Sequence, residues 1–302
     1  MTQKSKSTAG LQKPPWLKRR LPSGADFETV KGMISKNRLH TVCQEAKCPN
    51  IWECFSHHTA TFLIMGSRCT RDCRFCSIPN GPLEPPDRRE PARVAGTARK
   101  MGLKYVVITS VTRDDLPDGG AVHFAQTIEA LRQQIAGVRV EVLIPDFQGD
   151  ARALNTVLDA RPDVLNHNIE TVPRLYPEVR PQADYRRSLE LLQRARTYDI
   201  DLATKSGIML GLGEKPAEIK AAFRDLLTAG CRILTLGQYL QPSKEHLPVK
   251  RFVPPEEFDQ WRRTALEMGF AEAASGPFVR SSYHAGELFE EIKTSHGSDW
   301  PV

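Results

Sequence analysis

Three cysteines near position 70 carry the clearest chemical pattern in the sequence. Cys69, Cys73 and Cys76 lie in the segment CTRDCRFC, directly after a short apolar stretch. Three thiolates can bind three irons of a four-iron cluster and leave the fourth iron without a protein ligand. Catalysis needs such an open metal position, whereas a structural site is closed by four protein ligands. The alternatives are a redox thiol pair or a zinc site, but zinc sites usually supply two separated pairs of ligands.

A small molecule with an amino group and a carboxylate can chelate the open iron, and S-adenosylmethionine has both. An electron from the cluster then splits its sulfonium bond and releases a 5′-deoxyadenosyl radical. The protein has to place the cofactor and exclude water. The motif CxxxCxxC, with Phe75 before its last cysteine, resembles the radical S-adenosylmethionine superfamily.

A second group of three cysteines lies just upstream. Cys43, Cys48 and Cys54 occur in CQEAKCPNIWEC, so six of the seven cysteines fall within 34 residues. The N-terminus has no apolar core of an export signal, which makes a disulfide framework a poor explanation and metal binding a better one. Because three thiols are again one short of a closed shell, we predict a second iron–sulfur cluster.

The order of the two cysteine groups resembles the lipoyl synthase family. Four further blocks over roughly residues 40–290 agree with that family: TSVTRDDLPDGGA (109–121), NHNIETVPRLYPEVRPQADY (166–185), TKSGIMLGLGE (204–214) and GPFVRSSYHAGE (276–287). In the family, a serine of the closing motif is the fourth ligand of the auxiliary cluster. By position this corresponds to Ser282, with Ser281 as the alternative.

The resemblance implies a reaction at unactivated carbons. Two sulfur atoms are inserted at carbons 6 and 8 of a protein-bound octanoyl-lysine, with two molecules of S-adenosylmethionine used and the auxiliary cluster consumed as sulfur donor. The implied cofactors are two 4Fe-4S clusters and S-adenosylmethionine. The nearest rival is another sulfur-inserting radical enzyme, either biotin synthase-like or a methylthiotransferase. A zinc- or cluster-containing binding protein without catalysis is the alternative from a different class.

Four polar residues are candidates for cofactor binding. Asn168 and Glu170 alternate on one face at the end of a predicted strand, and we expect them to hydrogen-bond the ribose or amino group. We expect Arg180 and Lys205 to pair with the cofactor's carboxylate or to help close the site. The alternative is a polar strand end whose hydrogen bonds are satisfied within the protein.

The implied partners are octanoylated lipoyl carrier domains, namely E2 subunits of 2-oxoacid dehydrogenases and the glycine cleavage H protein. A reductant such as ferredoxin or flavodoxin is also implied. We expect no nucleic acid partner, because the body of the chain has no basic stripe with interleaved aromatics. No run of 18 apolar residues occurs, so we expect no membrane span and a cytoplasmic protein.

The elements that must position these residues alternate along the middle of the chain. Amphipathic segments, one with Phe124, Ile128, Leu131 and Ile135, lie between apolar stretches that predict buried parallel strands. This alternation predicts an α/β fold, and six units favour a partial (β/α)6 TIM-like barrel over a complete one. An open doubly wound sheet is the alternative. The predicted strands are Phe62–Met65, Tyr105–Thr109, Val138–Ile144, Val164–Ile169, Asp201–Leu210 and Ile233–Leu240.

Four regions follow from this organisation. Residues 1–40 form a basic arm with nine Lys or Arg and two acidic residues, while the whole chain carries +6. Residues 41–60 hold the auxiliary cluster, 61–245 the partial barrel, and 246–302 an extension that closes the site and supplies a serine ligand. The arm at Lys4–Arg20 is either a solvated tail or a docking element for an acidic carrier.

Overall fold

The protein, seen in a computed structural model that describes residues 12–18, 25–57 and 59–296, is built on one eight-stranded sheet. The strands follow one another in chain order. The first pair is antiparallel and all later pairs are parallel. The strands are β1 (His40–Thr41), β2 (Thr61–Ile64), β3 (Tyr105–Ser110), β4 (Arg139–Leu143), β5 (Val164–Asn166), β6 (Ala203–Leu210), β7 (Ile233–Gln238) and β8 (Glu272–Gly276).

All six predicted strands are confirmed, as β2 to β7. Their burial explains why the apolar runs were visible, since every residue of β2, β5 and β7 is buried. The sequence did not predict the two edge strands. β1 has only two residues, and β8 reads EAASG, without the β-branched and aromatic residues that are typical of strands.

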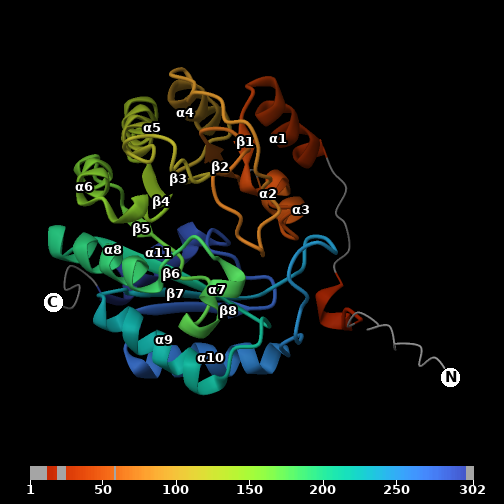
Figure 1. The fold of residues 1–302 in the computed structure, drawn as a ribbon. Coiled ribbons are helices and arrows are strands. Elements are labelled where there is room, and N and C mark those ends of the chain that lie inside the picture. Colours follow the sequence, from red (N-terminus) through yellow and green to blue (C-terminus); the bar gives the residue numbers. More distant parts are fainter. Residues whose placement is uncertain (1–11, 19–24, 58, 297–302) are drawn as a thin grey trace.

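The main helices α4, α5, α6, α8, α9 and α10 follow one another around the outside of the sheet (Figure 1). The predicted apolar face of α5 is confirmed, because Phe124, Ile128 and Leu131 are fully buried. In the described part of the chain, no helix is both long and apolar enough to cross a bilayer. The α-helices are α1 (Ala25–Lys36), α2 (Val42–Glu45), α3 (Ile51–Ser56), α4 (Glu90–Lys100), α5 (Ala121–Gln134), α6 (Ala151–Asp159), α7 (Tyr176–Val179), α8 (Tyr185–Tyr198), α9 (Pro216–Thr228), α10 (Pro255–Met268) and α11 (Ala285–His296). The 3-10 helices are η1 (Pro15–Leu17), η2 (Phe147–Gly149) and η3 (Pro173–Leu175).

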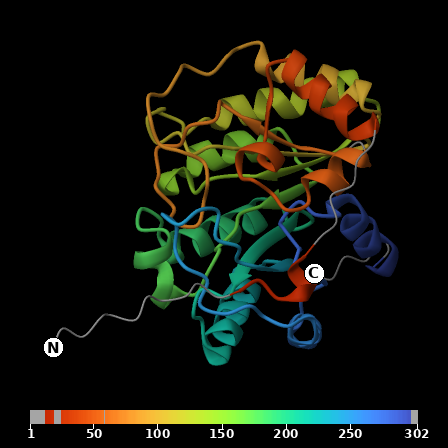
Figure 2. The ribbon, with the colours of Figure 1, turned by 90° about the vertical axis from the view of Figure 1, so that its right-hand side faces the viewer.

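The sheet is a partial barrel with six β/α units, as predicted, followed by β8 as a seventh parallel strand. Its edges are β1 and β8. Helix α11, dark blue in Figure 2, covers the amino ends of the strands through Leu288 and Phe289, which pack on Val164, Ala203 and Ile233. The opposite, carboxyl end of the sheet is where ligands bind in such folds.

Residues 1–11 and 19–24 of the predicted basic arm lie outside the described residues. Its described parts contain the short helix η1 and helix α1, of which Leu17 and Phe27 are buried. The boundaries drawn at positions 40, 60 and 245 remain predictions.

Candidate active site

The first cysteine group lies in the loop that follows β2. Its first thiol is held against the sheet, because Cys69 Sγ accepts hydrogen bonds from the backbone amides of Arg71 at 3.4 Å and Thr112 at 3.3 Å. Thr112 follows β3, so the loop sits at the carboxyl ends of two adjacent strands. The prediction that the thiols follow the first parallel strand of the barrel is confirmed by this position.

Arg71, inside the cysteine loop, anchors that loop to the sheet. Its Nε donates to Asp114 Oδ2 at 2.7 Å, and its Nη2 donates to Asp146 Oδ1 at 2.5 Å. Asp146 is fully buried and also pairs with Arg187 at 3.3 Å. Burial alone would raise the pKa of Asp146, but the Arg71 guanidinium holds it at about 2. None of these four residues was predicted from the sequence to act in the site.

Burial keeps two thiols of this loop neutral in the absence of a metal. It raises the pKa of Cys73 to about 11, against the opposing charge of Arg180, and that of Cys76 to about 12. A buried thiolate is costly unless a cation compensates its charge. Iron binding supplies that compensation and releases the protons, so these thiols fit metal ligands better than they fit nucleophiles.

Three of the four predicted cofactor contacts lie together beside this loop. Arg180 and Glu170 are close enough to Cys73 to affect its pKa electrostatically. Arg180 Nη1 donates to the carbonyl of Asn168 at 2.8 Å, and Asn168 Nδ2 donates to Glu170 Oε1 at 3.1 Å. Within the described residues, Asn168 Oδ1 and Arg180 Nε are buried without a hydrogen-bond partner. Unpaired buried polar atoms are rare, and here they fit a polar cofactor with a carboxylate.

The backbone at Glu170 is strained. Its φ is +65°, in the left-handed region that favours glycine, while its own amide and carbonyl pair with Gly207 and Met209 of β6. Strain of this kind persists only where the surroundings impose it, and it concentrates at ligand sites. Burial also raises the pKa of the Glu170 carboxyl, and Arg180 opposes that rise.

Lys205 lies apart from this group. Its Nζ pairs with Glu141 at 3.0 Å, and both side chains are about 1% exposed. Tyr105 and Asn166 complete the network by donating to the same carboxylate at 2.7 and 3.1 Å. The structure therefore gives Lys205 a partner inside the barrel, and its predicted contact with the cofactor remains a prediction.

The second cysteine group lies beside β2 and meets the C-terminal segment. Cys43, in α2, and Cys54, in α3, line one cavity together with Cys48 and Ser282. Burial raises the pKa of the Cys43 thiol, and the nearby Cys48 and Cys54 raise it further. The donor set of three thiols and one hydroxyl fits the four corners of an iron–sulfur cluster, each donor binding a different iron. The four donors of a cluster therefore do not have to converge on a single metal ion. Among the described residues, no three His, Cys, Asp or Glu side chains converge in that way.

The two candidate serines point to different places. Ser282 lines the cavity of the second cysteine group, whereas Ser281 Oγ accepts a hydrogen bond from Asn168 Nδ2 at 2.6 Å. The segment 277–284, which carries both, is held to α3 and its cap. Asn50 Nδ2 donates to the Phe278 carbonyl at 2.7 Å, and Tyr283 OH donates to Glu53 Oε1 at 2.8 Å.

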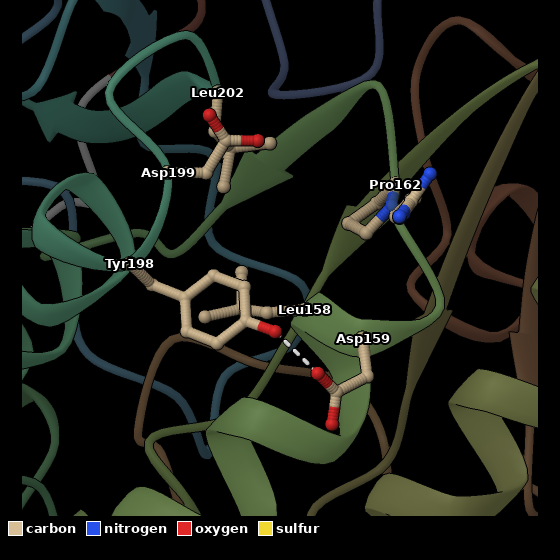
Figure 3. A pocket seen from close by; sticks show the side chains of 7 residues that line it. Leu158, Asp159, Pro162, Tyr198, Asp199 and Leu202 are labelled. Carbon is tan, nitrogen blue, oxygen red and sulfur yellow. Dashed lines mark hydrogen bonds between the residues drawn. The ribbon is translucent and has the colours of Figure 1, made fainter.

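Cavity size does not identify the site. A hollow of about 430 Å³ lies at the amino ends of β5 and β6, where Tyr198 OH donates to Asp159 Oδ1 (Figure 3). The cavity of the second cysteine group measures only about 20 Å³. The larger hollow contains no thiol and lies at the opposite end of the strands from the first cysteine loop. The thiol and hydroxyl donors, and not the volume, distinguish the cavity of the second cysteine group.

The partial barrel and the three-thiol loop are typical of radical S-adenosylmethionine enzymes, and comparison with known proteins identifies the same class. Residues 63–226 match the model of the Radical SAM superfamily. A crystal structure of Streptococcus suis SuiB bound to S-adenosylmethionine has a TM-score of 0.55 at 9% identity, over 72% of this chain and 50% of SuiB. A crystal structure of HydG, a maturase of the FeFe hydrogenase, has a TM-score of 0.58 at 15% identity, over 88% of this chain and 69% of HydG. These likenesses concern the fold.

Curated relatives narrow the class to one family. A lipoyl synthase of Rubrobacter xylanophilus is 54% identical over 93% of this chain and 88% of the relative. Lipoyl synthases of Desulfotalea psychrophila and Chlorobium phaeovibrioides are each 56% identical, over 93% and 91% of this chain and 94% and 97% of the relatives. Residues 1–48 match the N-terminal domain of lipoyl synthase. The chain belongs to the lipoyl synthase family.

Proposed function

We propose that this chain is a radical S-adenosylmethionine sulfurtransferase that inserts two sulfur atoms, at carbons 6 and 8, into a protein-bound octanoyl-lysine to form the lipoyl cofactor. The observation that carries the proposal is the position of the serine pair. Ser281 contacts Asn168 beside the first cysteine loop, and Ser282 lies with the thiols of the second group. Two adjacent residues therefore connect the predicted radical source with the predicted sulfur donor, which must both act on the same octanoyl chain.

The first site holds the radical source. Cys69, Cys73 and Cys76 would hold a 4Fe-4S cluster, with S-adenosylmethionine bound beside it. When bound, these groups supply the 5′-deoxyadenosyl radical that removes hydrogen from an unactivated carbon. Asn168, Glu170 and Arg180 bind the cofactor; the unpaired atoms Asn168 Oδ1 and Arg180 Nε support this role. The burial of Asn168 and Arg180 helps to exclude water from the radical.

The second site holds the sulfur donor. Cys43, Cys48, Cys54 and Ser282 are the ligands of an auxiliary 4Fe-4S cluster. A hard oxygen donor is an unusual partner for a thiolate-rich iron site, so we expect the serine-bound iron to be the most labile of the four. Asn50, Glu53 and Tyr283 hold the serine segment in place through the hydrogen bonds described above.

The substrate is an octanoylated lipoyl carrier protein. The proposal extends to E2 subunits of 2-oxoacid dehydrogenases and to the glycine cleavage H protein as carriers. A ferredoxin or flavodoxin is the proposed reductant, and the cytoplasm is the proposed location.

The direct test is an anaerobic assay with an octanoyl-lysine peptide, S-adenosylmethionine and a strong reductant. We expect sulfur-bearing peptide and 5′-deoxyadenosine to appear together, measured by mass spectrometry. A peptide with an unmodified lysine is the matched control and should gain no sulfur. 5′-Deoxyadenosine without any sulfur-bearing octanoyl peptide from the fully reconstituted protein would contradict the proposal.

A further inference from the structure

Thr61 joins the two chain segments that meet at the second cysteine group. It is the first residue of β2, and it is 6% exposed. Its hydroxyl donates a hydrogen bond to Ser282 Oγ at 2.8 Å, and its backbone lies beside the Cys43 thiol. Thr61 thus contacts both the Cys43 thiol and the Ser282 hydroxyl.

The other contacts of the serine segment do not involve the serine oxygen. Asn50 binds the Phe278 carbonyl, and Glu53 binds the Tyr283 hydroxyl. These bonds fix the path of the segment but leave the Ser282 side chain able to choose among its rotamers. In the described part of the chain, the hydrogen bond to Ser282 Oγ comes from Thr61.

Thr61 is held more firmly than the serine it contacts. Thr61 lies opposite Val107 of β3, and the next residue, Phe62, lies opposite Thr41 of β1, so β2 is paired on both sides. Ser282 belongs to a turn between β8 and α11. The Thr61 hydroxyl, on a strand paired on both sides, can therefore fix the direction in which the Ser282 side chain points.

We propose that Thr61 is the positioning residue for the serine ligand of the auxiliary cluster. Its hydroxyl holds Ser282 Oγ toward the thiols of Cys43, Cys48 and Cys54, while Ser281 is occupied by Asn168. The inference rests on the proposed function, because it presupposes the auxiliary cluster. Removing an outer partner of a metal ligand typically lowers metal affinity about 10- to 100-fold. We expect that loss for the serine-bound iron alone.

The test observes the auxiliary cluster by itself. Cys69, Cys73 and Cys76 are replaced by alanine, and the three-iron form of the remaining cluster is prepared, reduced by one electron with stoichiometric dithionite and then titrated with ferrous iron, so that the four-iron product is diamagnetic. Disappearance of the integer-spin electron paramagnetic resonance signal of the reduced three-iron form gives the dissociation constant of the fourth iron. Thr61→Val removes the hydroxyl but keeps the branched shape, and we expect its dissociation constant to rise about 10- to 100-fold.

Two variants separate positioning from a general loss of structure. Thr61→Ser keeps the donor and should bind the fourth iron like the parent chain. Thr204→Val removes another buried strand hydroxyl, which lies in β6 outside both cysteine groups and donates to the Gly230 carbonyl at 2.7 Å, and should also match the parent. In the Ser282→Ala background, Thr61→Val should cause no further loss, because both changes remove the same interaction.

The outcomes distinguish this inference from the proposed function. If the parent chain binds no cluster, the auxiliary site fails and the role of Thr61 fails with it. If the parent binds a cluster and Thr61→Val binds the fourth iron equally well, only the inference is overturned. An additional loss from Thr61→Val in the Ser282→Ala background would also overturn it.

Discussion

Replacing Cys43, Cys48 and Cys54 by alanine is expected to abolish sulfur insertion while 5′-deoxyadenosine is still formed. These thiols line the cavity that contains Ser282 and belong to a segment, 43–54, that precedes β2, whereas Cys69 follows β2. Removing them takes away the proposed sulfur donor and leaves the open-iron site intact. The measurement is the ratio of sulfur-bearing product to 5′-deoxyadenosine in one anaerobic reaction, and we expect it to fall to zero.

Two control variants make this result specific. Replacing Cys69, Cys73 and Cys76 should abolish both products, since the radical source is lost. Cys231→Ala should retain both, because this cysteine is fully buried just before β7 and outside both groups. Sulfur insertion at the normal ratio after loss of the second cysteine group would contradict the assignment.

Replacing Arg71 by leucine is expected to lower the free energy of unfolding by about 3 kcal/mol or more, because it leaves a buried aspartate without its main partner. That aspartate, Asp146, is fully buried and keeps the longer contact with Arg187 and a hydrogen bond from the Gln148 amide. The loop that carries Cys69 would also lose its anchor to β3 and β4. We therefore expect less iron bound and slower 5′-deoxyadenosine formation, alongside the shift in urea unfolding.

Arg74→Leu is the matched control for this prediction. Arg74 lies in the same loop but is exposed, so its replacement should change the free energy of unfolding by about 0.5 kcal/mol or less. Arg71→Lys should lie between the two, since an ammonium cannot reproduce the forked contact with Asp114. Equal stability of Arg71→Leu and Arg74→Leu would show that the ion pairs do not anchor the loop.

The parts of the fold with regular apolar patterns were predictable from the sequence. The buried strands β2 to β7 and the apolar face of α5 were recognised because burial on both faces, or on one helical stripe, dictates the residue types. Strand β8 was not, since its small residues carry no such pattern. The closing of the barrel's amino end by Leu288 and Phe289 depends on tertiary contacts that no local pattern specifies.

The cysteines of the site were predictable because their spacing is local. The contacts that position these cysteines could not be predicted, because they join residues that are far apart in the sequence. Arg71 lies 43 residues from Asp114 and 75 from Asp146, and Thr61 lies 221 residues from Ser282. No spacing rule connects positions so far apart. Adjacent serines also cannot be told apart by sequence, whereas their hydrogen-bond partners, Asn168 and Thr61, belong to different sites.

Iron and sulfide analysis of the anaerobically reconstituted full chain tests the central claim most directly. Two three-thiol sites, each completed by a ligand other than cysteine, predict about eight irons and eight sulfides per chain. Replacing the second cysteine group should reduce both numbers by half. A content of about four irons and four sulfides in the unaltered chain would mean a single cluster and would contradict the account.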